Sequence, residues 1–551
     1  MKTPLKLSQV VPNYAIPKTI QRSFSLVIFY LFFLQAASLS AQDQPNILLV
    51  IADDLGVDVS NGYHTGGLMP TTPTLDSLRS VGITFENVFA NPKCTPTRAS
   101  IMSGKFGVKT GVTATPGNLD LVHTSIFKAL AAQTSNEYAD AVIGKWHISS
   151  PADPNHPLEH DIDYYMGMLS SSVADYYAWQ KTENGATTTE TNYATTVLTD
   201  AAIDWVNDQT QPWFLWFAHV APHSPFHVPP SHMYSINATG TNYRKYIAMI
   251  ESIDFELNRL LYSMPEAVRN NTIIIYIGDN GTPGSVLQDY PMGHGKSTLY
   301  QGGIRVPMIV AGAGVTRMGE REAALVNVND IHATILDLAG GELPGGVFNS
   351  LSFAHLLKGE AGDTRKYNYA EIMGENKNGW TMREERYKLI KFTDGTEEMY
   401  DLLLDSLEIV NLLDNPLTAE QLTIKEDLEA EGIQTRDAWS CRDFIKNGDE
   451  EGIDCGGTYC TPCQTTGLTN AVVDISFDVH PNPTSDFLSI SNASQKLQEL
   501  TIYSILGERL LQIPALNQRE LKIDLSGLAP QTLLVEIQFP QGVKTVKVVK
   551  E

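Results

Sequence analysis

The stretch that decides the fold is Asn46-Ile-Leu-Leu-Val-Ile-Ala52, which is followed directly by Asp53 and Asp54. After Asn46 the run is continuously apolar, it has the length of one strand, and it lacks helical periodicity. Such a run is typical of a strand buried on both faces of a mostly parallel sheet. It therefore predicts an α/β fold.

Further apolar runs of strand length recur along the chain, at Ala139–Ile143, Trp213–Val220, Thr272–Ile277 and Val306–Val310. Between them lie segments with helical periodicity, at Pro73–Val81, Tyr243–Leu261 and Asn329–Leu338. The alternation predicts a mixed sheet with helices on its faces.

Polar residues cluster just after these runs, namely Asp53, Asp54, Lys145, His147, His223, Asp279 and Asn280. Open α/β sheets bind ligands at the carboxyl ends of their strands. We therefore expect these side chains to converge on one site.

The composition and the net charge limit the classes of protein to which this chain can belong. A chain of 551 residues with 42% hydrophobic and 19% charged residues is a folded protein of more than one domain. The formal net charge of −24 argues against a nucleic-acid or anionic-membrane partner. An anionic substrate would need a locally basic site.

The N-terminus predicts export. Basic residues precede an apolar stretch over residues 24–37, and small residues follow up to Ala41. This order is typical of a secretory signal peptide, here residues 1–41, and the alternative is a retained N-terminal anchor. The apolar stretch is shorter than the roughly 20 residues of a membrane span. We expect no stable membrane span.

The remaining chain divides into five predicted segments. A catalytic α/β domain covers residues 42–345, and a smaller α+β subdomain covers 346–435, with strands at Tyr387–Phe392 and Glu398–Asp401. A Cys-rich segment (436–466) and a linker (467–478) precede a small all-β domain (479–551). The strands expected in this last domain are Phe487–Ile490, Glu499–Tyr503, Glu520–Ile523, Leu533–Phe539 and Thr545–Val549.

Cys94-Thr-Pro-Thr-Arg98 resembles the C-x-P-x-R signature of type I sulfatases, in which the cysteine is oxidised to formylglycine (3-oxoalanine). Further segments resemble this family in the same order along residues 44–415. They are Pro45–Gly56, Gly144-Lys-Trp-His147, Ala221-Pro-His-Ser-Pro225, Gly278-Asp-Asn-Gly281, and Lys296 with Tyr300–Pro307. Gln301 stands where the family usually has Glu. The resemblance implies the alkaline-phosphatase-like fold with a smaller α+β C-terminal subdomain.

The resemblance also implies roles for these residues. Asp53, Asp54, Asp279, Asn280 and modified Cys94 would hold a divalent cation, and oxygen ligands suit Ca²⁺ or Mg²⁺. Arg98, Lys145 and Lys296 would neutralise the sulfate. His147 would act as a base, His223 or Lys296 would protonate the leaving alcohol, and Asp279 would help to deprotonate the attacking hydroxyl.

Three other histidines lie near these motifs. His294, close to Lys296, is a possible substrate contact. His219 and His227 flank His223 and are expected to be surface residues or substrate contacts.

Pro96 favours the first turn of a helix, so we expect a helix to start at Cys94 and to point its N–H groups at an anion.

Four cysteines lie together, at Cys441, Cys455, Cys460 and Cys463. In an exported chain they favour two disulfides of undetermined connectivity, with a Zn²⁺ site as the alternative. The segment resembles a Cys-rich module of secreted proteins from Bacteroidetes-type bacteria.

The final domain resembles the C-terminal sorting domain of type IX secretion, through His480-Pro-Asn-Pro483, Tyr503-x-x-x-Gly507 and the Lys547-Val-Val-Lys550 ending. A fibronectin-like spacer or a sugar-binding module is the alternative. The resemblance implies transit through the periplasm, with the type IX machinery as a partner, to the cell surface or medium.

The sequence thus predicts a sulfuric ester hydrolase that releases sulfate from sulfated polysaccharides or oligosaccharides after a maturase has modified Cys94. One alternative is a formylglycine-dependent phosphonate or phosphodiester hydrolase. Another is a catalytically silent surface glycan-binding protein.

Overall fold

The structure is a computed structural model. It describes residues 44–63, 67–135, 137–343, 349–374, 377–440, 478–491, 496–497, 499–504, 509–513, 518–539 and 542–550. The chain forms two compact units, residues 1–463 and 464–551. The predicted signal peptide, the four clustered cysteines and nearly all of the linker lie outside the described residues.

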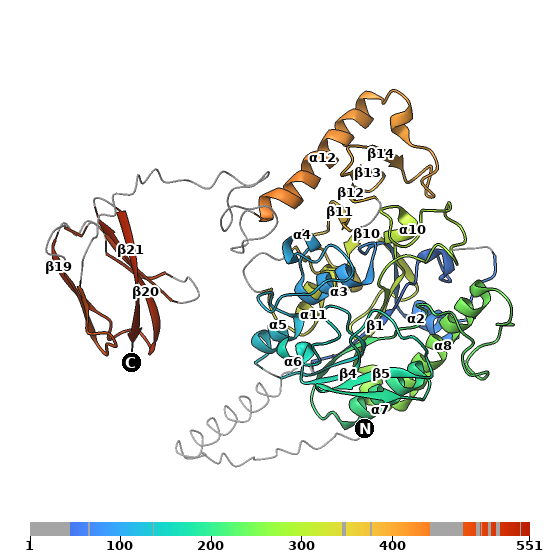
Figure 1. The fold of residues 1–551 in the computed structure, drawn as a ribbon, viewed down its shortest axis with the longest axis horizontal. Coiled ribbons are helices and arrows are strands. Elements are labelled where there is room, and N and C mark those ends of the chain that lie inside the picture. Colours follow the sequence, from blue (N-terminus) through green and yellow to red (C-terminus); the bar gives the residue numbers. More distant parts are fainter. Residues whose placement is uncertain are drawn as a thin grey trace, which may run out of the picture. The chain divides into compact units, whose positions relative to one another are not determined.

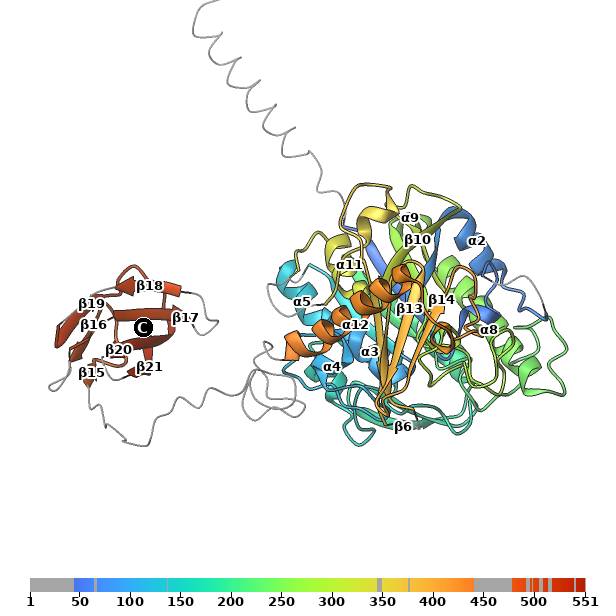
Figure 2. The same ribbon diagram turned by 90° about the horizontal axis from the view of Figure 1, so that it is seen from above.

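A large mixed sheet forms the centre of the first unit (Figures 1 and 2). Its strands, in spatial order, are β10 (Glu320–Asn327), β2 (Ile83–Phe89), β9 (Met308–Gly312), β8 (Thr272–Gly278), β1 (Asn46–Ala52), β7 (Trp213–Ala218), β3 (Ala139–Lys145), β4 (Tyr164–Met168), β5 (Trp179–Glu183) and β6 (Ala186–Glu190). Strands β8, β1, β7, β3 and β4 run parallel to their neighbours in this series.

The sheet is mixed, as expected. Strand β9 runs antiparallel to β8 and β2, because the loop from β8 returns the chain without a long crossover helix. Strands β4, β5 and β6 form an antiparallel edge. The edge strands were not expected, because they lack the continuous apolar runs of the central strands.

Two apolar cores lie on opposite faces of the sheet, and β1 contributes to both. Ile47, Leu49 and Ile51 pack in one core, and Leu48, Val50 and Ala52 pack in the other. The first core includes residues of α3 (Cys94–Ser103), α5 (Ile126–Gln133) and α11 (Asp330–Leu338). The second includes residues of α2 (Pro73–Val81), α7 (Ala194–Asp208) and α8 (Asn242–Ser263). This double burial explains why the run at 47–52 is continuously apolar.

One position of the central sheet requires glycine because two strands approach each other closely there. Gly144 has φ +121, and a Cβ at this position would lie 1.8 Å from the carbonyl oxygen of Ala218 on β7. Only glycine fits this conformation and this space. Gly144 thereby sets the direction of the chain into Lys145.

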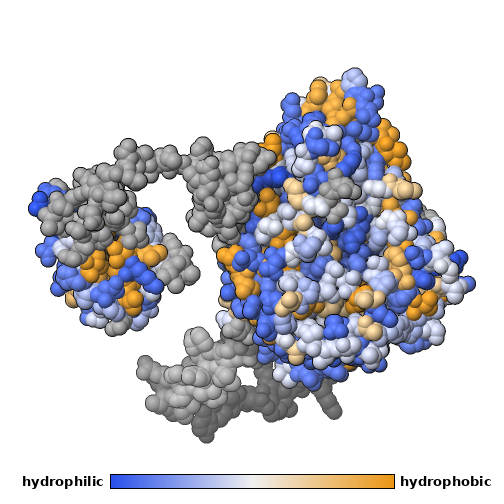
Figure 3. All heavy atoms as spheres, in the orientation of Figure 1, coloured by the Kyte–Doolittle hydropathy of each residue, from blue (hydrophilic) through white to orange (hydrophobic). Residues whose placement is uncertain are grey.

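A smaller antiparallel sheet follows, formed by β11 (Asn368–Ile372), β12 (Gly379–Arg383), β13 (Tyr387–Phe392) and β14 (Glu397–Asp401). Helix α12 (Ala419–Ser440) packs on β12 and β13. The helix continues past residue 435, where the sequence suggested a boundary. Apolar side chains gather over this subdomain at the top of Figure 3, and Leu403, Leu404, Ile409 and Val410 are exposed.

Short helices complete the first unit. They are α4 (Gly107–Thr110), α6 (His156–Glu159), α9 (Glu266–Asn270), α10 (Gln301–Ile304), η1 (Val57–Val59), η2 (Ala354–Leu357) and η3 (Leu412–Asp414). No helix in the described part of the chain combines the length and the apolar character of a membrane span.

The second unit is all-β, as expected. A three-stranded sheet contains β15 (Asp478–His480), β16 (Phe487–Ser491) and β19 (Glu520–Asp524). A four-stranded sheet contains β18 (Arg509–Ile513), β17 (Glu499–Ser504), β20 (Gln531–Phe539) and β21 (Gly542–Lys550). Residues from both sheets share one apolar core. Strands β15 and β18 were not expected from the sequence.

Candidate active site

Asp53 and Asp54 follow β1 at the centre of the sheet and are buried. Because Ala52 pairs with Gly278 of the parallel strand β8, the two strands deliver Asp53 and Asp279 to the same edge. The N–H of Asp279 donates to the carbonyl of Ala52 (3.1 Å), and the N–H of Asp54 donates to Oδ1 of Asp279 (3.0 Å). The sheet register thus brings the aspartates together.

Cys94 is the first residue of α3, as expected, and its side chain is buried. Its Sγ lies 3.2 Å from Nδ1 of His147. Ligand atoms of Asp53, Cys94 and Asp279 all lie within 4.8 Å of one another. Residues that are more than 180 positions apart in the sequence therefore converge on the thiol.

Three cations pair one to one with the three aspartates. The guanidinium of Arg98 donates to Oδ2 of Asp279 through Nε (3.1 Å) and Nη2 (2.9 Å). The ammonium of Lys145 donates to Oδ2 of Asp53 (2.5 Å).

The third pair is formed by Lys296, which donates to Oδ1 of Asp54. Neither partner of the first two pairs is accessible to solvent. In this dry environment, positive charge beside Cys94 interacts strongly with an anion.

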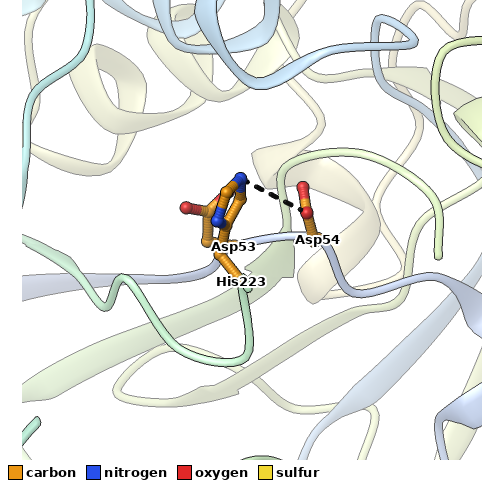
Figure 4. A group of neighbouring side chains, drawn as sticks. All are labelled: Asp53, Asp54 and His223. Carbon is orange, nitrogen blue, oxygen red and sulfur yellow. Dashed lines mark ion pairs between the residues drawn. The ribbon is translucent and has the colours of Figure 1, made fainter. Parts of the chain in front are cut away.

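His223 lies beside the aspartate pair, and its Nε2 is 3.6 Å from Oδ2 of Asp54 (Figure 4). His147, which contacts the thiol, also contacts Thr95 Oγ1 through Nε2 (3.2 Å). Burial, assisted by Lys145 and Arg98, lowers the pKa of His147 to about 2. The imidazole of His147 is therefore neutral.

The buried acids respond differently to their surroundings. Burial acts to raise the pKa of Asp53, but the nearby cations, above all Lys145, outweigh it and lower that pKa below its usual value. Burial and then the charge of Asp53 raise the pKa of Asp279 to about 7. Burial also raises the pKa of the Cys94 thiol.

Three residues of the site adopt left-handed backbone conformations without being glycine, namely Asp54 (φ 67), His147 (φ 58) and Ser297 (φ 70). Such conformations are uncommon for residues with a side chain and cluster at functional sites. Here they orient the side chains of Asp54 and His147 and the loop that follows Lys296.

The donor set fits a hard divalent cation. Oδ1 of Asp53 and Oδ1 of Asn280 are buried and have no hydrogen-bond partner among the described residues. Buried acceptors without a partner are costly, and a cation would satisfy both. Carboxylate and amide oxygens are ligands that Ca²⁺ and Mg²⁺ prefer.

The comparison with family models decides the family. The model described as Sulfatase matches residues 45–341, which include every residue of the candidate site. The chain belongs to the sulfatase family. A second model, N-sulphoglucosamine sulphohydrolase, C-terminal, matches residues 293–435, and the secretion system C-terminal sorting domain matches residues 478–551.

Relatives of this sulfatase chain have diverged in sequence. Mouse arylsulfatase J is 28% identical over 56% of this chain and 54% of its own length. Human N-acetylgalactosamine-6-sulfatase is 26% identical over 54% of this chain and 63% of its own. The alignments thus span about half to two thirds of these relatives. N-acetylglucosamine-6-O-sulfatase of Bacteroides thetaiotaomicron is 26% identical over 67% of this chain and 82% of its own length.

Solved structures share the fold. The crystal structure of Ps i-CgsB in complex with k-i-k-neocarrahexaose has a TM-score of 0.63 and 23% identity, and the match covers 71% of this chain and 92% of the other. PsFucS1 sulfatase from Pseudoalteromonas sp. has a TM-score of 0.59 and 21% identity, covering 75% and 95%. These matches support the sulfatase fold of the first unit.

The geometry of the sulfatase site unites ten of the residues that the sequence singled out. They are Asp53, Asp54, Cys94, Arg98, Lys145, His147, His223, Asp279, Asn280 and Lys296. His294 lies outside this set and stacks on Tyr300, with ring centroids 3.6 Å apart.

The expectation for His219 is wrong. Its side chain is fully buried, and neither ring nitrogen has a hydrogen-bond partner among the described residues. It follows β7 and packs edge-on against Phe217, and burial lowers its pKa to about 3. His227 is partly buried, and its ring packs against that of Tyr176 with the centroids 4.0 Å apart and the planes tilted by 32°. A histidine beside the end of a strand can face the interior, which the local sequence does not reveal.

Two features of the site were missed. Thr95 contacts His147, and its place inside the Cys94–Arg98 motif could have indicated a role. The buried pair of Lys388 and Glu408 supports the loop that carries Lys296, because Lys388 donates to the carbonyl of Leu299 (2.6 Å) and Glu408 accepts the N–H of Gln301. No local motif marks this second contact.

Proposed function

We propose that this sulfatase hydrolyses sulfuric esters and releases inorganic sulfate, with formylglycine at position 94 as the reacting group. The observation that carries the proposal is the convergence of Asp53, Cys94 and Asp279 within 4.8 Å, surrounded by Arg98, Lys145 and Lys296. A bare thiol has no evident need for three cations and a buried set of oxygen ligands. A group that attacks a bound anion needs both.

In this proposal Asp53, Asp54, Asp279 and Asn280 hold Ca²⁺ or Mg²⁺. The support is the hard donor set and the two buried acceptors described above. When bound, the cation would supply Lewis-acid charge to the sulfate and to residue 94.

Oxidation of Cys94 by a maturase would supply an aldehyde whose hydrate has one hydroxyl to attack sulfur and a second to expel sulfate afterwards. His147, which contacts the side-chain atom of residue 94, takes the proton of the second hydroxyl. Asp279 accepts the proton of the attacking hydroxyl, and His223 or Lys296 protonates the leaving oxygen. Arg98 and Lys145 hold the sulfate charge.

Sulfated polysaccharides or oligosaccharides are the proposed substrates. Several relatives carry names of sulfatases that act on N-acetylated amino sugars. The sorting domain matched at residues 478–551 indicates export, and we infer delivery by type IX secretion to the cell surface or medium, where polymers are met. His294 is the proposed contact for the sugar.

Release of sulfate from 4-nitrophenyl sulfate, compared with hydrolysis of bis(4-nitrophenyl) phosphate, tests the reaction class. We expect the sulfate ester to be preferred in kcat/KM and the Cys94→Ala variant to lose nearly all turnover. Dominant diester hydrolysis would instead favour a phosphodiesterase. Binding of sulfated glycans without any turnover by protein carrying formylglycine would favour a silent binding protein.

A further inference from the structure

A cavity of about 440 Å³ adjoins the loop that carries Lys296. His294, Ser297, Thr298 and Tyr300 from this loop line one part of it, and Lys377 and Phe392 from the C-terminal subdomain line another. The volume is in the range of about 300–1,000 Å³ that small-molecule sites have. We call this space the 294–392 cavity.

The loop joins the cavity to the reacting site. Lys296 donates to Asp54, while the next residue, Ser297, donates its N–H to the carbonyl of Pro92 (2.9 Å), two residues before Cys94. Ser297 also lines the cavity. The same loop therefore contributes Lys296 to the reacting site and Ser297 to the cavity.

The aromatic side chains of the cavity suit a sugar ring. His294 and Tyr300 stack with an interplanar angle of 6°, which makes a flat and rigid pair. Phe392 adds an apolar ring, and Ser297 and Thr298 add hydroxyl groups. At the rim, Met292 is 97% exposed. Apolar surfaces with a few polar groups are typical of sites that bind small organic molecules.

Lys377 gives the cavity a positive charge. Its Nζ lies 4.7 Å from the ring centroid of Phe392 and 3.9 Å from Oε1 of Glu398, and its side chain is 59% exposed. Glu398 is already engaged, because its Oε2 accepts the hydroxyls of Tyr300 (2.7 Å) and Tyr400 (2.8 Å). An exposed ion pair of this length contributes little, so the ammonium of Lys377 is available to an anion.

We propose that the 294–392 cavity binds a second sugar of the substrate, one linked to the reacting sugar and carrying an anionic group that faces Lys377. The inference rests on the proposed function and adds that the preferred substrate is an oligosaccharide with negative charge on neighbouring sugars. That charge can be a sulfate ester or a carboxylate.

Binding to the Cys94→Ala variant separates this site from the chemistry. The three probes are N-acetylgalactosamine 6-sulfate, a chondroitin 6-sulfate tetrasaccharide with neighbouring carboxylates, and an ι-carrageenan tetrasaccharide with neighbouring sulfates. Isothermal titration calorimetry should show at least one tetrasaccharide binding about tenfold or more tighter than the monosaccharide, as expected for a contact worth about 1.4 kcal/mol. The tetrasaccharide that binds identifies the anionic group.

Adding Lys377→Ala to the Cys94→Ala variant should abolish this advantage. The matched control is Lys128→Ala on helix α5, because Lys128 is 61% exposed and lies 3.7 Å from Asp161, much as Lys377 lies near Glu398. The control should retain the advantage.

Two results would overturn the proposal: neither tetrasaccharide binds more tightly than the monosaccharide, or Lys377→Ala has no effect. Sulfate release from 4-nitrophenyl sulfate by the chain with formylglycine is measured separately, so a failure of the reaction and a failure of the cavity are distinguishable.

Discussion

Residue 94 lies among charges that are matched in pairs. Asp53 and Asp279 each pair with one cation, and Asp54 pairs with Lys296 and lies beside His223. In the proposed reaction a sulfate ester meets three cations whose positions are already fixed. Fixed charges need not reorganise as negative charge moves during the reaction. The predictions for single residues follow from these contacts.

We predict that His147→Ala lowers kcat for 4-nitrophenyl sulfate by about 100-fold or more, because general acid–base groups contribute about 10²–10⁴-fold. Steady-state kinetics with protein carrying formylglycine gives the measurement. The exposed His232, which contacts Phe255, provides the control variant His232→Ala, with an expected change below about twofold. A kcat for His147→Ala close to that of the unchanged chain would rule out its role as the base.

We predict that chelation with EDTA lowers the midpoint of thermal unfolding and that Ca²⁺ or Mg²⁺ restores it. A ligand at 100 times its Kd stabilises the folded state by about 2.7 kcal/mol. Tryptophan fluorescence reports this for the first unit, because every tryptophan precedes residue 464.

Asp53→Asn should lose the response to the cation, whereas Asp200→Asn, on the exposed surface of α7, should keep it. An Asp53→Asn variant that responds as strongly as the unchanged chain would place the cation elsewhere.

Residues at the ends of the central strands were predictable from the sequence. Asp53 and Asp279 follow apolar runs, and parallel pairing of β1 and β8 is enough to bring them together. The burial of His219 was not predictable, because its neighbours in the sequence do not show which side of the β7 terminus faces the interior. The antiparallel direction of β9 was not predictable either, because it depends on the path of the long loop between β8 and β9.

At the scale of secondary-structure elements, the small sheet supports the active-site loop. Lys388 of β13 donates to the carbonyl of Leu299, and Glu408, which follows β14, accepts the N–H of Gln301. Both side chains are fully buried in this ion pair. Such a contact between distant elements has no periodic signature in the sequence, so it was visible only in the structure.

We predict that Lys388→Met destabilises the first unit by about 3–5 kcal/mol, because it leaves the buried carboxylate of Glu408 without its charged partner. Urea unfolding followed by tryptophan fluorescence measures the change. The double variant Lys388→Met/Glu408→Gln should recover part of the loss, since it removes both charges.

Lys425→Met on α12 serves as the control, because the side chain of Lys425 is 20% exposed and its partner Glu397 is 26% exposed, and it should change the free energy of unfolding by less than about 1 kcal/mol. If Lys388→Met lowers the free energy of unfolding by no more than this control does, the buried pair does not support the fold.

At the scale of the whole molecule, the stability of the first unit depends on pH through a buried acid outside the active site, Asp140. Asp140, on β3, accepts the N–H of Asp163 (2.9 Å). Burial, together with the charges of Asp163 and Asp161, raises the pKa of Asp140 to about 7 from its usual 3.8. Between these values the folded chain binds more protons at this site than the unfolded chain does.

The stabilisation from Asp140 is therefore complete below about pH 4 and is lost as the pH rises through about 7. We predict that Asp140→Asn gains stability relative to the unchanged chain over this range, by up to about 1.4 kcal/mol per pH unit. Urea unfolding at several pH values gives the difference. In the control variant Asp208→Asn, at an exposed position, the free energy of unfolding should change with pH as it does in the unchanged chain. If the free energy of unfolding of Asp140→Asn also changes with pH in that way, the prediction is contradicted.

The whole molecule combines two compact units that match different family models. The first unit matches the sulfatase models over residues 45–435, and the second unit matches the sorting domain over residues 478–551. Pairing of Cys441, Cys455, Cys460 and Cys463 in two disulfides stays a prediction, because these residues lie outside the described part of the chain.

Mass spectrometry of the tryptic peptide Cys94–Arg98, from protein purified out of the cells that produce it naturally, tests the central claim most directly. Conversion of the cysteine to formylglycine lowers the peptide mass by about 18 Da. We predict that the lighter peptide predominates and reacts with an aldehyde-specific hydrazide reagent. Recovery of the peptide only with an intact thiol, from protein that releases sulfate, would contradict the account.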